Sequence, residues 1–347
     1  MNKKKPKNTD SRALAWEFGT ISVQSMGAMI GPSVFILPNG KQVNPFYIAP
    51  WHGEEVGDEV DNLTRHLRGE WPCVPFGYPM PTEHFPKAWR DVLDENESID
   101  FVHGYGSHHN WTFEPPDGNE ISMYIDYPSD HDIARLTRTI RPDPNAPAVE
   151  LRLGIQARRP TCQPVSLHTC LRLPNQPQGA KIVPGKFTKG HTHPSIVLPG
   201  SQQFQPDRTF LSLEEVPHIL GGNIDASRVP FKEDIEEVMQ LEKTDGKAAL
   251  HHIEEDWMVT LDWDSDVLPD LLLWYSNRGF KAEPWNGRNV CLGMEPVCSP
   301  FGLSPNTAQI ANPYQQKASP TCVSLSPDST LYIDYRIEVK PLDKFKL

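Results

Sequence analysis

The chain has 347 residues, of which 38% are hydrophobic and 22% are charged, with a formal net charge of −12. This composition supplies enough apolar material for a large core and excludes a membrane-embedded or fibrous protein. The acidic balance also argues against a nucleic-acid partner, because phosphate binding depends on clustered lysines and arginines. No run of about 18 apolar residues occurs, so we expect no transmembrane helix and no membrane partner. We predict a cytoplasmic location.

The basic segment Lys3–Lys7 is followed by polar residues rather than by the apolar region of a signal peptide. We therefore predict a flexible N-terminal tail over residues 1–12. No internal repeat, low-complexity linker or break in composition divides the remainder. The expected organisation is a single domain over residues 13–347.

Turn-forming residues divide the chain into short extended segments. The 35 prolines and 23 glycines are spread throughout, which is typical of an all-β protein. Pro38-Asn39-Gly40 predicts a tight hairpin. Residues 231–241 depart from this pattern, because apolar residues at three- and four-residue spacing predict a short surface helix there. The predicted strands are Ile21–Val23, Ser33–Leu37, Ile121–Tyr127, Val149–Gln156, Val165–Leu173, Trp257–Leu261, Leu271–Tyr275 and Thr330–Val339.

Six cysteines are widely spaced along the chain, and none forms a Cys-x-x-Cys pair. They are too sparse for a disulfide framework in a chain of this length. We expect reduced and mostly buried thiols.

A rigid loop over residues 67–77 combines Arg68 with Trp71, Phe76, two prolines and two glycines. Pyranose rings stack their C–H faces on aromatic rings while an arginine donates hydrogen bonds to sugar oxygens, so this loop is a candidate sugar subsite. The alternative is a loop packed under the core with Arg68 in a salt bridge.

The segment 103–111 contains three histidines, His103, His108 and His109, and ends at Trp111. Histidines at this density beside glycines favour a polar pocket wall over three unrelated structural residues. A metal site is the competing interpretation, since imidazole is a common metal ligand. It is weakened because Glu114, the nearest downstream acid, precedes two prolines and no cysteine is near.

Two further segments place a titratable group on a predicted strand. The strand Val165–Leu173 alternates, so His168 points away from the face that carries Leu167 and Leu171; that direction is either solvent or a cleft. Glu295 ends a nearly apolar strand, and a glutamate is rarely buried without a partner or a function. The alternative interpretation is that Glu295 forms an ion pair at the surface, at the end of the strand. Burial would raise its pKa and make it a stronger base.

The order of these motifs resembles the galactose mutarotase-like superfamily, in particular aldose 1-epimerases and hexose-6-phosphate epimerase-like proteins. The resemblance covers residues 25–340 and implies a large antiparallel β-sandwich, a supersandwich, with a few short helices and no cofactor or metal. The matching segments are Arg68-Gly69 to Phe76-Gly77, His103-Gly104 to Trp111, Leu167-His168-Thr169 and Met294-Glu295-Pro296.

The resemblance also implies roles for these residues. His168 would be the general acid that protonates the ring oxygen, and Glu295 the general base that removes the proton of the anomeric hydroxyl. Opening, rotation and reclosure of the ring would then interconvert anomers. The substrate-binding residues implied are Arg68, His103, Trp111 and Trp71. We thus expect an isomerase of the aldose 1-epimerase type that binds a small carbohydrate, as a monomer or weak dimer.

Two alternatives remain beside the mutarotase. The first is a catalytically silent carbohydrate-binding protein of the same fold. The second is a cupin-like metalloenzyme that uses His191, His193 and another histidine, although no glutamate follows within the next several residues and a loop over the pocket mouth fits that segment better. Arg158, Arg159, Lys186 and Lys189 could bind a phosphate or carboxylate, or could be solvated surface charges. Glu70-Trp71 departs from the smaller residues expected after Arg68-Gly69.

Overall fold

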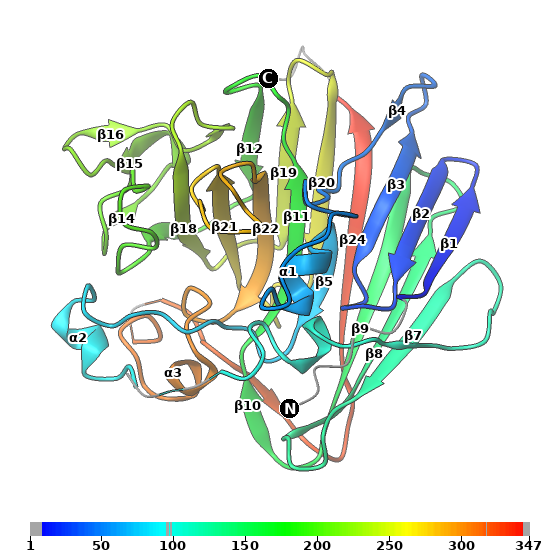
Figure 1. Cartoon of the computed structure of the whole chain (residues 1–347), viewed down its shortest axis with the longest axis horizontal. Helices are drawn as coiled ribbons and strands as arrows, with labels where there is room; N and C mark the ends of the chain where they lie inside the picture. Colours follow the sequence, from blue (N-terminus) through cyan, green and yellow to red (C-terminus); the bar gives the residue numbers. More distant parts are fainter. Residues whose placement is uncertain (1–8, 95–96, 98, 317, 343–347) are drawn as a thin grey trace.

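Two large antiparallel β-sheets stacked on each other form the body of the molecule (Figure 1). The computed structural model describes residues 9–94, 97, 99–316 and 318–342. One sheet has seven strands in the order β14-β13-β18-β21-β22-β11-β5. Its members are β5 (Glu70–Cys73), β11 (Val165–Arg172), β13 (Lys189–Thr192), β14 (Thr209–Phe210), β18 (Ile235–Glu242), β21 (Asp270–Asn277) and β22 (Val290–Cys298).

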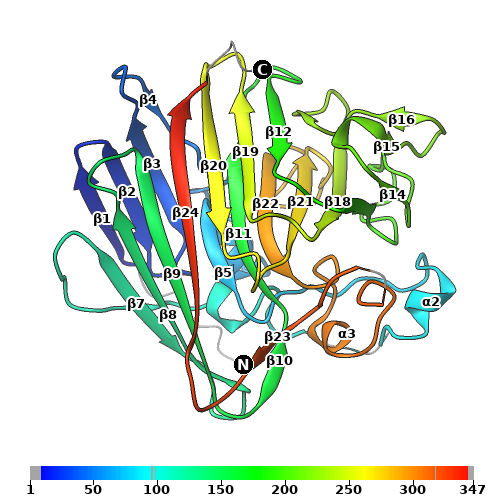
Figure 2. The ribbon, with the colours of Figure 1, turned by 180° about the vertical axis from the view of Figure 1, so that it is seen from behind.

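The second large sheet has nine strands in the order β17-β12-β19-β20-β24-β9-β8-β7-β6, and it faces the viewer in Figure 2. Two of its members, β20 and β24, alternate buried and more exposed residues, so each has one face on the core. Its members are β6 (Thr112–Phe113), β7 (Ile121–Asp126), β8 (Ile133–Pro142), β9 (Ala148–Ala157), β12 (Ala180–Pro184), β17 (Arg228–Val229), β19 (Lys247–His252), β20 (Trp257–Trp263) and β24 (Leu331–Pro341).

Smaller elements complete the described fold. A four-stranded sheet lies in front of the β7–β9 end of the nine-stranded sheet (Figure 1) and shares its apolar core. It contains β1 (Ser11–Trp16), β2 (Gly19–Gln24), β3 (Ile30–Ile36) and β4 (Gln42–Val43). Two short antiparallel pairs are β10 (Thr161–Gln163) with β23 (Val323–Leu325) and β15 (Val216–Pro217) with β16 (Asn223–Ile224). The α-helices are α1 (Asn62–His66), α2 (Lys87–Arg90) and α3 (Pro305–Gln309).

A charged cluster is enclosed between the two large sheets. The carboxylate of Glu70 forms an ion pair with Arg138 of β8, and both side chains are fully buried. The Tyr335 hydroxyl of β24 donates to Glu70 Oε1 at 2.9 Å, and Arg138 Nη1 donates to the Ala28 carbonyl at 2.6 Å. The cluster therefore ties β5 to the nine-stranded sheet with hydrogen bonds on both charged groups.

Every strand predicted from the sequence is confirmed, as is the all-β sandwich with few short helices. The hairpin at Asn39 is also confirmed, because β3 pairs with β4 across a turn in which Gly40 has φ +81°. The surface helix predicted for residues 231–241 is wrong. That segment contains β18, whose residues are all buried. A strand covered on both faces has no apolar alternation, so a chance helical spacing dominated the pattern.

The predicted N-terminal tail is too long. Residues 1–8 lie outside the described residues, but Ser11 and Arg12 already belong to β1, where they pair with Gln24 and Val23. In the part of the chain that is described, no helix is both long and apolar enough to cross a membrane.

The prediction of six reduced thiols is wrong for two of them. Cys162 and Cys322 form a disulfide that joins the β10–β23 pair across a sequence separation of 160 residues. Cys73, Cys170, Cys291 and Cys298 are free and buried, as expected. The large separation explains the error, because no local spacing signals the pairing.

Candidate active site

A cavity of about 450 Å³ lies on the face of the seven-stranded sheet that points away from the nine-stranded sheet. Side chains from β5, β11, β18, β21 and β22 line its floor, and residues of α1 and of segment 76–81 line its sides. Figure 1 shows α1 in front of β5 and β11. The opposite face of these strands carries the apolar residues of the inter-sheet core, including Leu167 and Leu171. The alternation predicted for residues 165–173 therefore holds, and His168 faces the cavity.

Strand register brings the two predicted catalytic residues together. Trp71 of β5 pairs with His168 of β11, and Leu272 of β21 pairs with Glu295 of β22. The flanking pairs Ser166 with Val297 and Cys170 with Gly293 place His168 opposite Glu295. A row of Trp71, His168, Glu295 and Leu272 therefore crosses the cavity floor.

The His168 ring is held on three sides. It stacks on Trp71 with centroids 4.1 Å apart and an interplanar angle of 15°. Nδ1 contacts Cys170 Sγ at 3.5 Å, and Nε2 lies 3.4 Å from Glu295 Oε1. Burial lowers the pKa of His168 well below its usual range, and the neighbouring His103 adds to that shift. The imidazole is therefore neutral in the empty pocket at neutral pH.

Glu295 is enclosed with little to stabilise a negative charge. Its side chain is 1% exposed, and among the described residues neither carboxyl oxygen has a hydrogen-bond partner of good geometry. Burial raises the pKa of Glu295 well above its usual range, and the Ser166 hydroxyl opposes this shift. Gly293 provides the space for the carboxyl group, because a Cβ there would lie 2.5 Å from Oε1. The surroundings of Glu295 therefore favour its neutral, protonated form.

Two further polar groups lie beside this pair. His103 stacks on Phe76 with centroids 4.8 Å apart, and its ring centroid is 5.2 Å from that of His168. Burial lowers the pKa of His103 to about 3, with a smaller contribution from His108. Tyr78 lies across from His103, with ring centroids 6.1 Å apart. His103 Nδ1, the Tyr78 hydroxyl and Trp71 Nε1 are buried without a hydrogen-bond partner in the described structure.

Aromatic rings form another wall of the cavity. Trp285 packs against Trp274 and Phe280 with centroid distances of 6.3 and 5.0 Å, and all three line the cavity. Trp274 Nε1 donates to Glu236 Oε1 at 2.6 Å, and Ser276 Oγ donates to Glu236 Oε2 at 3.0 Å. Burial raises the pKa of Glu236 to about 8 despite these donors. Glu236 thus fixes the orientation of Trp274 from behind the wall.

Two of the four predicted sugar-binding residues do not reach the cavity. Trp71 and His103 line it, but Arg68 does not. The Arg68 guanidinium is hydrogen-bonded to the carbonyls of His66 and Gly31 and to Nδ1 of His52. The position of Arg68 next to the cavity residue Leu67 turns its side chain the other way, so its predicted sugar contact is not supported.

Trp111 is also directed away from the cavity. It is 2% exposed within the inter-sheet core, and its Nε1 donates to the Gly106 carbonyl at 2.9 Å. Of the three histidines at 103–109, His108 binds the Val102 carbonyl and His109 stacks on Tyr105. The predicted polar wall is therefore reduced to His103.

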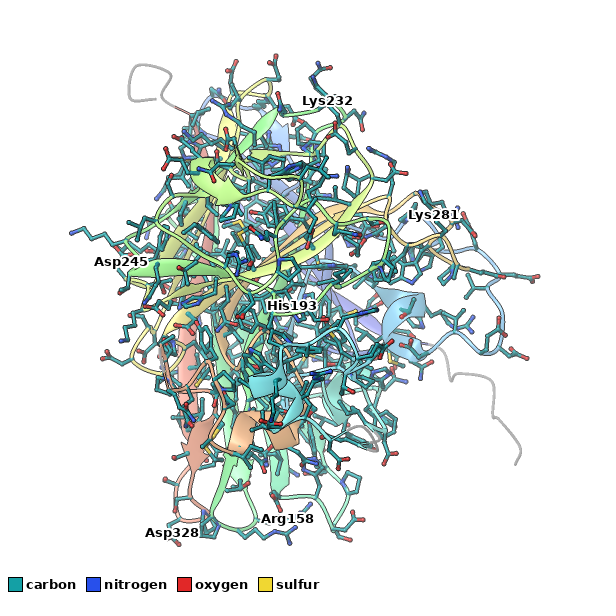
Figure 3. All side chains as sticks on the ribbon, turned by 90° about the vertical axis from the view of Figure 1, so that its left-hand side faces the viewer. Arg158, His193, Lys232, Asp245, Lys281 and Asp328 are labelled. Carbon is teal, nitrogen blue, oxygen red and sulfur yellow. A yellow bond between two sulfur atoms is a disulfide. The ribbon has the colours of Figure 1, made fainter. Side chains whose placement is uncertain are left out.

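Segment 186–194 is part of a sheet rather than a loop over the pocket. Residues Lys189–Thr192 form β13, which pairs with β18. His191 Nε2 lies 2.7 Å from Glu242 Oε2, while His193 Nδ1 lies 2.8 Å from the Ser195 carbonyl. Figure 3 shows His193 within the body of the molecule. Within the described ranges, no group of three or more His, Cys, Asp or Glu residues could hold a metal ion.

The basic residues considered for phosphate binding do not line the cavity. Arg158 donates to the Tyr127 carbonyl at 2.7 Å, and Arg159 pairs with Asp132. In Figure 3, Arg158 lies at the lower end of the molecule. Their interactions are those of surface residues near the β9–β10 turn.

Sequence reasoning missed two residues that shape this site. Tyr78 follows the Phe76-Gly77 turn by one residue, and its aromatic, polar character beside that motif was an available signal. Glu236 was placed on a helix. That segment also carries Glu233, Asp234 and Glu237, so no sequence signal distinguished Glu236 as a buried acid.

No protein-family model and no curated protein sequence matches this chain. Solved structures do match. An Escherichia coli protein provisionally described as an aldose 1-epimerase superposes with a TM-score of 0.62 at 12% identity, covering 96% of this chain and 100% of that one. The GalM/aldose epimerase homologue from C. elegans gives 0.63 at 11% identity, with coverage of 97% and 100%.

A galactose mutarotase related enzyme from Lactobacillus acidophilus gives a TM-score of 0.58 at 9% identity, covering 96% of this chain and 99% of that one. These similarities extend over the whole of the compared structures. The chain therefore has the galactose mutarotase-like fold, as the order of its motifs predicted.

Proposed function

We propose that this protein is a mutarotase that binds an aldose in the cavity and interconverts its anomers through His168 and Glu295. The observation that carries the proposal is the position of these two groups, 3.4 Å apart on the floor of a 450 Å³ cavity. Ring opening of a hemiacetal needs one proton delivered to the ring oxygen and one removed from the anomeric hydroxyl. A neighbouring acid and base facing one cavity meet that requirement.

The pair can hold one transferable proton. Burial raises the pKa of Glu295 and lowers that of His168, which favours a protonated Glu295 beside a neutral His168. The mutarotase-like assignment, with His168 as acid and Glu295 as base, requires that proton to pass from Glu295 to His168 Nε2 when the sugar binds. Sugar hydroxyls that donate to the carboxylate would favour this transfer, because hydrogen bonds to the charged form lower a carboxyl pKa.

Binding groups for the sugar are also available. Trp71 Nε1 and His103 Nδ1 have no partner in the described protein, so they can bond to sugar oxygens without breaking existing hydrogen bonds. Trp274, Trp285 and Phe280 can stack on the C–H face of the ring. No step requires a cofactor or metal, and we propose a monomer or weak dimer.

Anomer exchange measured by exchange NMR across a panel of aldoses tests the proposal. The wild type should accelerate equilibration of at least one sugar, and Glu295→Gln should lower the rate by about two to four decades. The matched control is Glu120→Gln, which removes an acid that pairs with Arg141 away from the cavity and should keep the wild-type rate. Full activity in Glu295→Gln would sink the proposal.

A binding protein without turnover is the second candidate, and the same panel distinguishes it. Saturable sugar binding with no acceleration by the wild type would favour it. The cytoplasmic location stays a prediction, and the Cys162–Cys322 disulfide runs against it because such bonds are rare in the cytosol.

A further inference from the structure

Most polar groups of the cavity gather in one small cluster. Its hydrogen-bonding side chains are Trp71, Tyr78, His103, His168 and Glu295, and the Thr64 hydroxyl and the Trp285 indole N–H line the cavity outside it. Their rings are close neighbours, since Trp71 and His103 lie 4.1 and 5.2 Å from His168 between centroids. This cluster is large enough to bond to the ring oxygen and the anomeric hydroxyl of a sugar. Few hydrogen-bonding groups then remain for the more distant hydroxyls.

Two other polar groups at the cavity surface already donate hydrogen bonds within the protein. The Thr64 hydroxyl donates to Asp61 Oδ2 at 2.8 Å, and the Trp274 indole N–H donates to Glu236. Trp274 can therefore contact a ligand with its ring, but its indole N–H is not available as a donor. The remaining lining is apolar and comes from α1, β18, β21 and the segments around Met80 and Val197.

The described lining includes no lysine or arginine and no carboxylate other than Glu295, which burial keeps neutral. Phosphate and carboxylate groups on ligands are normally bound by arginine, lysine or arrays of N–H donors. A charged sugar would lose its hydration here without compensation.

A free hexose fits this surface poorly for the same physical reason. It carries a hydroxyl on nearly every carbon, and each hydroxyl buried without a partner costs about 1 to 3 kcal/mol. The volume also exceeds the need of one ring: a cavity of roughly 150 Å³ holds a benzene molecule, and this one measures about 450 Å³.

We propose that the substrate is an uncharged aldose with a free anomeric hydroxyl and an apolar substituent elsewhere on the ring. This inference rests on the proposed mutarotase function. The hemiacetal edge would face His168 and Glu295, and the substituent would lie against Val238, Val197 and the Trp274–Trp285 wall. Burial of that substituent supplies binding free energy in proportion to its apolar area.

The test compares four probes, D-glucose, 6-deoxy-D-glucose, 6-O-benzyl-D-glucose and D-glucose 6-phosphate, by exchange NMR and by titration calorimetry. The benzyl sugar should exceed glucose at least tenfold in kcat/KM, the deoxy sugar should fall between them, and the phosphate should show neither turnover nor binding. Equal or better turnover of glucose, or turnover of the phosphate, would overturn the inference while leaving the mutarotase function in place.

Calorimetry measures binding without turnover, so it tests the proposed ligand class separately from the mutarotase function. Preferential binding of the benzyl sugar with no anomer exchange would uphold the ligand class and refute the function. No binding of any probe would refute both.

A pair of matched variants locates the preference in the cavity. Val238→Thr introduces a hydroxyl into the apolar lining at nearly constant volume and should reduce the benzyl-to-glucose ratio several-fold. Val183→Thr makes the same change on half-buried β12, outside the cavity, and should leave the ratio unchanged. An unchanged ratio in Val238→Thr would contradict the proposed position of the substituent.

Discussion

Glu70 and Glu295 are both completely enclosed, but the protein surrounds them differently. Glu70 lies between the two large sheets, where Arg138 and Tyr335 satisfy its carboxylate. Glu295 lies on the opposite face of the seven-stranded sheet, beside the His168 imidazole at the floor of the cavity. Burial raises the pKa of Glu70, and Arg138 is the largest influence that opposes the shift. The first carboxylate has the partners of a structural residue, whereas the second retains unsatisfied oxygens that a ligand can use.

Removing the partner of the structural glutamate should have the largest effect on stability. Arg138→Met leaves Glu70 buried without its counter-ion, and breaking a buried pair in this way costs about 3 to 5 kcal/mol. Urea unfolding of the variant measures the loss. The double variant Glu70→Gln/Arg138→Met should recover much of it, because no charge remains buried. A double variant less stable than Arg138→Met would contradict the assigned role of the pair.

Filling the space beside Glu295 should have a smaller effect on stability and a clear effect on activity. Gly293→Ala places a methyl group 2.5 Å from Oε1 and 2.9 Å from the Trp274 Cβ. Overpacking of this kind costs about 1 to 3 kcal/mol, and displacement of the carboxyl group should lower the anomer exchange rate.

The control for this change is the same substitution made in a Glu295→Ala variant, which lacks the carboxyl group that the new methyl group would contact. Gly293→Ala should destabilise that background less than it destabilises the wild type in urea unfolding. Equal losses in both backgrounds would show that Glu295 does not occupy the space provided by Gly293.

The most gradual effect concerns the pH dependence of stability. The pKa of Glu295 is raised in the folded state, so the folded protein binds a proton more tightly than the unfolded chain. The resulting contribution is fully present below the ordinary carboxyl pKa and is lost as pH rises toward the folded pKa. Above about pH 4.5, the wild type should lose stability relative to Glu295→Gln by up to about 1.4 kcal/mol per pH unit.

Urea unfolding of both proteins across the pH range measures this difference. Glu120→Gln is again the matched control, because its partly exposed carboxylate pairs with Arg141. A pH-independent difference between the wild type and Glu295→Gln would show that Glu295 is already ionised in the folded protein.

The sequence was informative where one face of a strand differs from the other. Alternation along residues 165–173 placed His168 opposite the core face, and the apolar surroundings of Glu295 marked it as a carboxylate in need of a partner. Alternation was absent in β18, which is buried on both faces, and the segment was therefore assigned to a helix.

Side-chain direction outside regular alternation could not be predicted. Arg68 follows α1 and binds carbonyls of His66 and Gly31, and that choice depends on segments brought together only in the fold. Trp111 enters the inter-sheet core for the same reason. The Cys162–Cys322 bond joins residues 160 positions apart, so its formation depends on the pairing of β10 with β23.

The most direct test of the central claim is a double-mutant cycle on the rate of anomer exchange, with His168→Gln, Glu295→Gln and the variant that carries both changes. Each single variant should lose about two to four decades in rate, and the double variant should lose no more than the worse single one, because an acid and a base that move one proton act as a unit. Losses that add in the double variant, or a wild-type rate in either single variant, would contradict the claim that this pair performs the chemistry.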